Sequence, residues 1–327
     1  MPIVHSVFQY IVRRILWAIV LFLTITVVAY VIFFIIPADP AQLACGQRAS
    51  PECLRNATRN LGLDKPVYEQ YGKFLTRLVI HHDLGKSYFN RQSVNTTVLN
   101  AAPVTASLVL GGALLWMLVA LPIGVLSALR PRSLLDRTSM VFVLIGISAH
   151  PVWIGLILSY VVGFKLGWTP ITGYCDFFNP STGCGGPVQW AYHMVLPWIT
   201  FSVLFAALYV RMIRANVMEA SSEDYVRTAR AKGAPEHVVI RSHILRNALL
   251  PVVTMLGMDI GVALGGAIFT ETIFALPGLG QTSLSAIQNF DLPTVQGVVV
   301  FATISIIVFN LVVDLLYAVI DPRIRLS

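Results

Sequence analysis

Long uncharged apolar runs constrain this chain more than any other feature. Residues 15–36 carry no charged side chain and include sixteen Ile, Leu, Val or Phe residues. At about 0.3–0.6 kcal/mol for each of these residues, moving the run into a bilayer is favoured by roughly 5–10 kcal/mol. A cleavable signal peptide is the alternative. However, the run is longer than the apolar core of a signal peptide, and no small-residue cleavage site follows it. The run therefore predicts a helix that stays in the membrane.

Five further apolar runs are about as long as a membrane span, since a helix needs about 20 apolar residues to cross the bilayer core. They cover residues 104–129, 139–164, 194–210, 249–270 and 294–313, and Asp259 is the one charged residue within them. Pro151 lies inside the run 139–164, where we expect it to kink the helix. The chain has 327 residues, of which 56% are hydrophobic and 12% charged. The sequence thus predicts an all-α integral membrane protein with six transmembrane helices.

The basic residues indicate how the six helices are oriented. If the N-terminus is cytoplasmic, fourteen of the 23 Lys and Arg residues fall in inner segments, and eight of the other nine lie in the long segment 37–102. Short inner loops retain positive charge, whereas long loops are translocated regardless of charge. We therefore expect cytoplasmic N- and C-termini, with a first helix and tail (1–36), an extracytoplasmic segment (37–102), a five-helix domain (103–320) and a C-terminal tail (321–327).

The segment 37–102 is long enough to contain helices of its own. After Pro66, apolar residues recur at spacings of three and four, as in Val67, Tyr71, Phe74 and Leu78. This spacing is typical of one face of an amphipathic helix. We expect that face to pack on the spans or on the bilayer surface rather than to form a binding groove.

The four cysteines fall in the two predicted outer segments. Cys45 and Cys53 lie in the first, and Cys175 and Cys184 in the second. An oxidising exterior permits one disulfide in each loop, although four cysteines allow three pairings. A metal site is the rival interpretation, but the sequence has neither a C-x-x-C spacing nor a histidine cluster beside these cysteines, so we expect no metal.

The inner loop 216–247 is basic and is also patterned as ordered structure. Ser221 and Ser222 offer a hydroxyl cap for a helix, and Gly233 can end that helix in the left-handed conformation. Pro235 then suits the first turn of a second helix, which has an apolar stripe. The loop therefore predicts a helix, a glycine turn and a second helix.

Three kinds of partner suit such a basic hairpin: nucleic acid, anionic lipid or another protein. The flanking spans hold the hairpin close to the membrane, which disfavours nucleic acid, and contact with lipid alone is the less favoured alternative to docking. A short helix with small residues can enter a groove closely, so we favour docking into a protein. The docking residues that we expect are Arg227, Thr228, Ala229, Lys232, Gly233, Ala234, Pro235, Glu236 and His237.

Residues 227–233 read Arg-Thr-Ala-Arg-Ala-Lys-Gly, and residues 246–251 read Arg-Asn-Ala-Leu-Leu-Pro. This loop resembles the EAA-type coupling loop of binding-protein-dependent ABC importers, although Arg227 stands where glutamate is commonest in that family. Two further motifs, Asp-Leu-Gly-Lys-Ser at 83–87 and Leu-Pro-Gly-Leu-Gly at 276–280, extend the resemblance. Over most of its length the chain is similar to the type I dipeptide and oligopeptide permease branch.

The resemblance implies a permease subunit in a prokaryotic plasma membrane. Its implied partners are a sister permease, two cytoplasmic ATPases and an extracytoplasmic peptide-binding protein. ATP and Mg²⁺ would belong to the ATPases, because the sequence has no Gly-x-x-x-x-Gly-Lys-Ser/Thr phosphate loop. We therefore expect no cofactor and no catalytic residues in this chain. Related systems also carry nickel chelates and glutathione, so these ligands stay open.

Two groups of residues are expected to take part in translocation. Asp259 falls near mid-membrane, where it should face protein or water, and we expect it either to line the path or to form a structural pair. The segment that holds Glu271, Pro277 and Gly278 is too interrupted for a seventh span, and we expect it to form an outer gate. A secondary transporter would normally place more ionisable groups at mid-membrane, and no paired carboxylates or metal-ligand spacing indicates a membrane enzyme.

Overall fold

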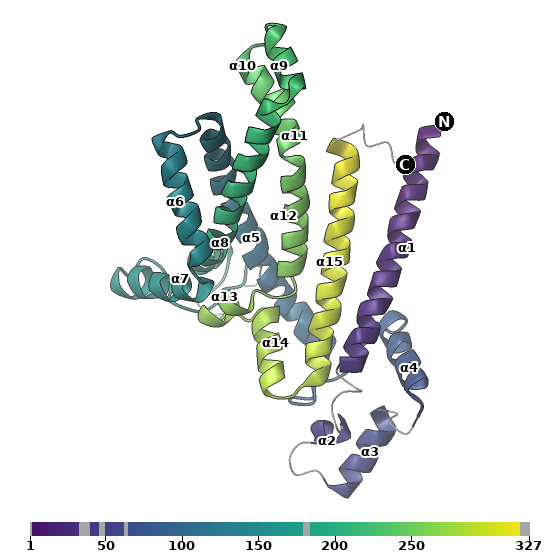
Figure 1. Ribbon diagram of the computed structural model, residues 1–327. Helices are drawn as coiled ribbons and strands as arrows, with labels where there is room; N and C mark the ends of the chain where they lie inside the picture. Colours follow the sequence, from purple (N-terminus) through teal and green to yellow (C-terminus); the bar gives the residue numbers. More distant parts are fainter. Residues whose placement is uncertain (1, 33–39, 46–49, 62–64, 179–183, 321–327) are drawn as a thin grey trace.

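The computed structural model describes residues 2–32, 40–45, 50–61, 65–178 and 184–320, and these residues are almost entirely helical, as the apolar runs predict (Figure 1). Within them, four helices are long and apolar enough to cross a membrane unaided. They belong to α1 (Pro2–Tyr30), α5 (Val94–Leu129), α8 (Pro187–Ser222) and α15 (Leu292–Ile320). The number of spans rises to six if each of two bent helix pairs is counted as one.

The first bent pair replaces the predicted third span. The chain forms α6 (Leu134–Ser148), then α7 (Pro151–Leu158) and the π-helical turn η2 (Ser159–Lys165), with a bend of 100° between the two parts. Pro151 therefore does not kink a continuous helix. It begins α7, and His150 caps that helix by accepting the N–H of Val152 at 3.3 Å. With 15 residues, α6 extends about 22 Å, short of the bilayer core.

The predicted fifth span is also interrupted. It consists of α12 (Leu250–Ala263), which meets the preceding short helices at a bend of 43°. The chain turns at Gly265 and Gly266 before α13 (Ile268–Ile273). Glycines allow α12 to pack closely on α15: a methyl group on Gly257 would overlap Val313, and one on Gly265 would lie 2.8 Å from Cβ of Ala302.

The core lies between α5 and α8, which pack together along most of their length. Trp116 of α5 is fully buried and stacks on Phe205 of α8 with ring centroids 4.6 Å apart. The outward face of α5 carries Leu110, Leu114 and Leu118, which are 50–64% exposed and four residues apart. An exposed leucine stripe at helical spacing is what a helix presents to lipid.

Short helices lie at the end of the molecule where α1 finishes (Figure 1). They are α2 (Pro40–Cys45), α3 (Pro51–Leu61) and α4 (Val67–Val79). Tyr71 and Phe74 of α4 pack on Tyr30 of α1, each with ring centroids 5.6 Å away, and the hydroxyls of Tyr71 and Thr26 are 3.0 Å apart. The amphipathic helix that the sequence predicts therefore packs on a span.

The opposite end of the molecule carries the predicted hairpin. Figure 1 shows α9 (Asp224–Ala231) and α10 (Glu236–Val238) projecting beyond the bundle, at the same end as the start of α1 and the finish of α15. We call this the hairpin end and its opposite the far end. The predicted tail, 321–327, lies outside the described residues.

Candidate functional site

The hairpin continues directly from α8, whose last residue is Ser222. Gly233 turns the chain with φ of +78°, as predicted, and its N–H donates to the carbonyl of Arg230 at 2.9 Å. The guanidinium of Arg230 then donates to both carboxylate oxygens of Glu236, at 2.7 and 3.2 Å, and this contact raises the pKa of Arg230 above its ordinary value. A left-handed glycine and a bidentate ion pair together close the turn.

The inner face of the hairpin is part of the protein core. Val226, Val239 and Ile244 are fully buried and belong to the same cluster as Ile213 and Val217 of α8. The second arm consists of α10, η3 (Val239–Leu245) and α11 (Arg246–Ala248). Since burial in this cluster fixes both arms to α8, the hairpin is a rigid extension of the bundle.

The outer face holds most of the residues that the sequence assigned to docking. Seven of the nine are exposed and Ala234 is half-buried; the exposed ones are Arg227, Thr228, Lys232, Gly233, Pro235, Glu236 and His237. Ala229 differs, because it is only 8% exposed and packs inside the hairpin. It is too buried to contact a partner, and its small size instead lets the arms approach.

The predicted hydroxyl cap of α9 is absent. Ser221 and Ser222 belong to the last turn of α8, and their hydroxyls donate back to the carbonyls of Val217 and Glu219 at 2.6 and 2.8 Å. Glu223 stands at the cap position, and its side chain makes no capping hydrogen bond. Serine hydroxyls inside a helix commonly bond to the preceding turn in this way, so the cap signal was misleading.

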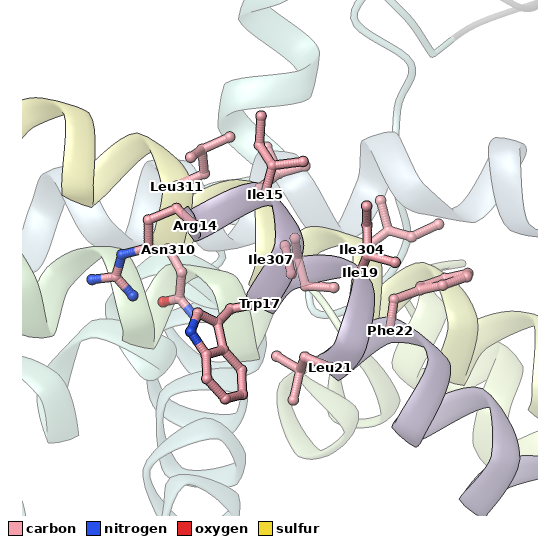
Figure 2. Close-up of a pocket in the computed structure, with 12 residues that line it drawn as sticks. Arg14, Ile15, Trp17, Ile19, Leu21, Phe22, Ile304, Ile307, Asn310 and Leu311 are labelled. Carbon is pink, nitrogen blue, oxygen red and sulfur yellow. The ribbon is translucent and has the colours of Figure 1, made fainter. Parts of the chain in front are cut away.

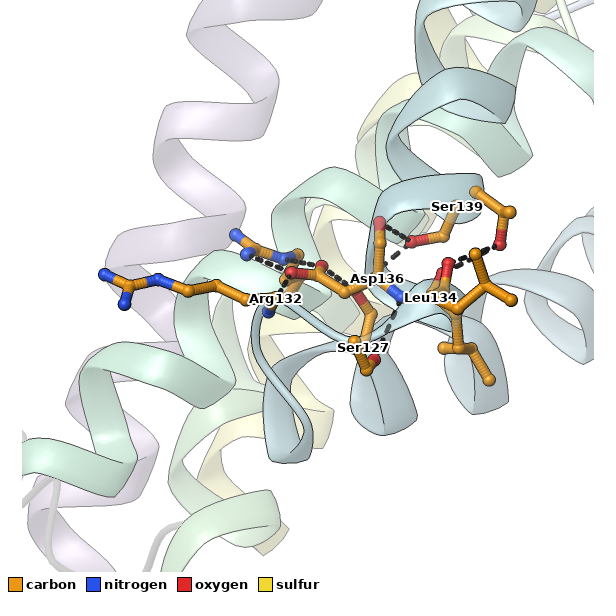
Figure 3. Close-up of polar contacts among 9 residues, drawn as sticks. Ser127, Arg132, Leu134, Asp136 and Ser139 are labelled. Carbon is orange, nitrogen blue, oxygen red and sulfur yellow. Dashed lines mark hydrogen bonds and ion pairs between the residues drawn. The ribbon is translucent and has the colours of Figure 1, made fainter.

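A buried ion pair lies behind the hairpin, and sequence reasoning missed it. Asp136 is only 5% exposed, and its carboxylate accepts hydrogen bonds from Nε and Nη2 of Arg214 at 2.6 and 3.0 Å. It also accepts the N–H of Arg132 at 2.9 Å and the hydroxyl of Ser127 (Figure 3). Ser133 caps α6 by accepting the N–H of Asp136 at 3.2 Å. This Ser-x-x-Asp signature could have located the helix start, but nothing local indicates the partner on α8.

Asp259 pairs with a tyrosine at the centre of the bundle. Its Oδ2 accepts a hydrogen bond of 2.7 Å from the hydroxyl of Tyr209 on α8. Tyr209 is 2% exposed and lies against Trp116, with ring centroids 5.8 Å apart, whereas Asp259 keeps partial exposure. The hydrogen-bond partner of Asp259 is therefore a neutral hydroxyl and not a cation.

Glu271 is fully buried and organises the segment that was expected to form a gate. It accepts the hydroxyl of Thr105 at 2.8 Å and the N–H groups of Ala267 and Gln281 at 3.3 and 3.0 Å. Thr105 in turn accepts the N–H of Leu279 at 2.8 Å. We call this network the Glu271 knot: it joins α13 and the start of α14 (Leu279–Gln288) to α5.

The other two predicted gate residues flank the knot. Gly278 is buried, and a Cβ at this position would lie 2.5 Å from the carboxyl group of Glu271. Pro277 is exposed and lines a pocket of about 300 Å³ together with Gln281 and Thr282. Of the three, only Pro277 is therefore placed to meet another molecule, and Glu271 and Gly278 hold the segment in shape.

A second buried carboxylate joins the far-end loops. Asp291 accepts the hydroxyls of Ser87 and Thr294, each at 2.6 Å, and the N–H of Tyr88 at 2.8 Å. Burial, reinforced by the charge of Asp291, raises the pKa of the Tyr88 hydroxyl to about 12. The Asp-Leu-Gly-Lys-Ser motif thus connects α4 and α5 to the start of α15.

The cysteines are joined within each loop, Cys45 to Cys53 and Cys175 to Cys184. His193, which sequence spacing did not reveal, places Nδ1 3.3 Å from the sulfur of Cys175. The ligand atoms of Cys175, Cys184 and His193 lie within 4.8 Å of one another, a spacing that suits a metal ion. Sulfurs that are bonded to each other offer no thiolate, however, so the disulfide and a metal exclude one another.

The described residues thus form an exposed hairpin at one end, a buried ion pair behind it and a buried carboxylate network at the far end. Residues 120–326 match the family described as the binding-protein-dependent transport system inner membrane component, and residues 7–109 match its N-terminal companion. The chain belongs to this family and is therefore a multi-pass inner-membrane permease component.

Individual relatives agree with this assignment. The chain is 39% identical to the dipeptide transport system permease protein DppB of Escherichia coli K12 over 97% of its own length and 98% of the relative's. It is 38% identical, with the same coverage, to the di/tripeptide permease protein DppB of Pseudomonas aeruginosa. In fold it resembles a chain of the inward-facing MetNI methionine ABC transporter, with a TM-score of 0.53, 18% identity and coverage of 68% and 96% of the two chains.

Proposed function

We propose that this chain is the membrane permease subunit of an ATP-driven importer of di- or oligopeptides. The observation that carries the proposal is the rigid hairpin, whose exposed outer face projects beyond the bundle while its inner face is continuous with the core. The peptide specificity of the two permease relatives supports the choice of substrate.

The partners are a sister permease, two cytoplasmic ATPases and an extracytoplasmic peptide-binding protein. The hairpin end faces the cytoplasm, which places both termini inside and α2–α4 outside. ATP and Mg²⁺ bind to the ATPases, and this chain needs no cofactor of its own. Closure of the ATPases pushes on the hairpin, and because α8 continues into it, the force reaches the core directly.

Arg214 and Asp136 extend this route to α6. Arg214 lies eight residues before the end of α8, about 12 Å from the hairpin along the helix axis. Because the ion pair links α8 to the start of α6, the α5–α6 turn moves with α8 when the hairpin moves. At mid-bundle, Asp259 lines the path and attracts the cationic amino group of a peptide.

At the far end, the segment from α13 to α14 forms the outer gate. The Glu271 knot ties this segment to α5, so we expect it to open by moving together with that part of α5 rather than by unfolding. A cysteine placed at Ile287, which is 55% exposed on α14, should crosslink to the sister permease to a different extent with and without ATP. Crosslinking that is independent of nucleotide would contradict the gate.

The direct test is reconstitution. The chain is purified with its co-expressed partners in lipid vesicles, and ATP hydrolysis is measured with the binding protein and with dipeptides, oligopeptides, a nickel chelate or glutathione. We expect stimulation by peptides and co-isolation of two ATPases. Transport by the isolated chain, or stimulation by the other ligands alone, would overturn the proposal.

A charge reversal tests the docking face. Lys232→Glu should weaken co-isolation of the ATPases, because Lys232 is exposed beside the hairpin turn. Arg137→Glu provides a matched control, since Arg137 is an exposed cation at the same end but lies on α6. If both variants lost ATPase co-isolation equally, the cause would be a general charge effect and not docking at the hairpin.

A further inference from the structure

A groove of about 410 Å³ runs between α1 and α15 (Figure 2). One end is polar, where Arg14 and Trp17 of α1 lie near Asn310 of α15. The rest is apolar and leads to Phe22 and Ile304. Arg14 and Phe22 are eight residues apart on one helix, so the groove is about 12 Å long.

The groove has one cationic end and an apolar body. A guanidinium offers five donors in a planar fork that matches a phosphate group, and the neighbouring indole and carboxamide supply further polar groups. The walls beyond them are aliphatic and aromatic. Phosphate at one end and hydrocarbon along the rest is the chemistry of a phospholipid.

The depth of the groove suits a lipid of the inner leaflet. Arg14 directly precedes the apolar run 15–36 and lies in the first half of α1, whose start is at the hairpin end (Figure 1). Trp17, 65% exposed, stands one turn deeper, where tryptophan is enriched at membrane interfaces. The cytoplasmic leaflet is rich in anionic lipids. This step rests on the proposed function, which makes the hairpin end cytoplasmic.

Most of the surface of α1 is left uncovered by the residues that the structure describes. Only 11% of its apolar window is buried within the chain, and its packing is chiefly on α15 and α4. The groove is open along its length, so an occupant lies along α1 and α15, and a helix of the sister permease is the alternative that the test below excludes. An acyl chain is much thinner than a helix and can lie along it.

We propose that the α1–α15 groove binds one anionic phospholipid, whose phosphate meets Arg14 and whose acyl chain lies between the helices. The lipid completes the contact of α1 with α15 and holds the first helix on the bundle.

The test is native mass spectrometry of the purified complex with phosphatidylglycerol or phosphatidylcholine added at equal concentration. We expect the anionic lipid to bind more tightly, and Arg14→Gln to reduce its affinity about fivefold. Arg13→Gln is the matched control, because Arg13 is also exposed but does not line the groove; it should change the affinity less than twofold. Ile307→Trp, which fills the groove, should displace both lipids.

The proposal would be overturned if the two arginine variants lost affinity for the anionic lipid equally, or if the protein showed no preference for that lipid. A crosslink from a cysteine at Trp17 to the sister permease, with no bound lipid, would assign the groove to that subunit instead. Lipid binding is measured without ATP or peptide. Absence of lipid binding would therefore not contradict the importer function, and absence of ATPase binding would not contradict the lipid site.

Discussion

The pair formed by Arg214 and Asp136 allows a quantitative test of how the hairpin is coupled to the bundle. The side chain of Asp136 is 7% exposed and that of Arg214 is 25% exposed. Arg214→Met leaves a buried carboxylate without its cation, which costs 3–5 kcal/mol in typical proteins. Because the hydroxyl of Ser127 and the N–H of Arg132 still donate to Asp136, we expect the low end of that range, about 3 kcal/mol.

The opposite change should cost less. After Asp136→Asn, the long side chain of Arg214 can move its guanidinium toward solvent, and we expect a loss of about 1.5 kcal/mol. The double variant replaces an ion pair by two neutral groups and should lose about 2 kcal/mol. The coupling energy of the pair is then about 2.5 kcal/mol.

The assay is unfolding of the purified chain by SDS in mixed micelles, followed by helical circular dichroism. Arg230→Met is the control: it breaks an ion pair of similar geometry whose side chains are 44% and 56% exposed, and it should change stability too little to resolve. Additive losses from the two single variants, or a larger loss from Asp136→Asn than from Arg214→Met, would refute the reasoning.

Three further predictions follow from single positions. Gly278→Ala should lower stability by about 1–3 kcal/mol in the same assay, because its methyl group meets the carboxyl of Glu271; Gly72→Ala, in open space on α4, should not destabilise. Asp259→Asn should lower the rate of peptide uptake or change its specificity in reconstituted vesicles, and normal uptake would remove Asp259 from the path. Gly233→Ala, at φ of +78°, should cost about 1–2 kcal/mol and weaken co-isolation of the ATPases, whereas unchanged co-isolation would show that the turn conformation is dispensable.

Sequence reasoning succeeded where a local pattern decides the structure. Uncharged runs identify α1, α5, α8 and α15, because no other structure can accommodate so much apolar surface. Gly233 marks its turn, since the left-handed residue that ends a helix is usually glycine. Hydropathy alone did not reveal the 100° break before Pro151, because an apolar helix that turns aside has the same composition as one that continues across the membrane.

The contacts behind the site are not local. Arg214 is 78 residues from Asp136, and Thr105 is 166 residues from Glu271. Each partner considered alone resembles an ordinary loop charge or an ordinary helix hydroxyl. Such pairings depend on how helices are arranged in three dimensions, which a single sequence does not encode in any short pattern.

The long separation within the Glu271 knot has a consequence for biogenesis. Thr105 enters the membrane early in synthesis, but its carboxylate partner is translated only after four-fifths of the chain has been made. Until then the hydroxyl of Thr105 lacks both of its partners in the knot, Glu271 and the N–H of Leu279, and a chain truncated before residue 271 cannot form the network. The knot can therefore form only after most of the chain has been made, so this end of the bundle is among the last parts to reach its final structure.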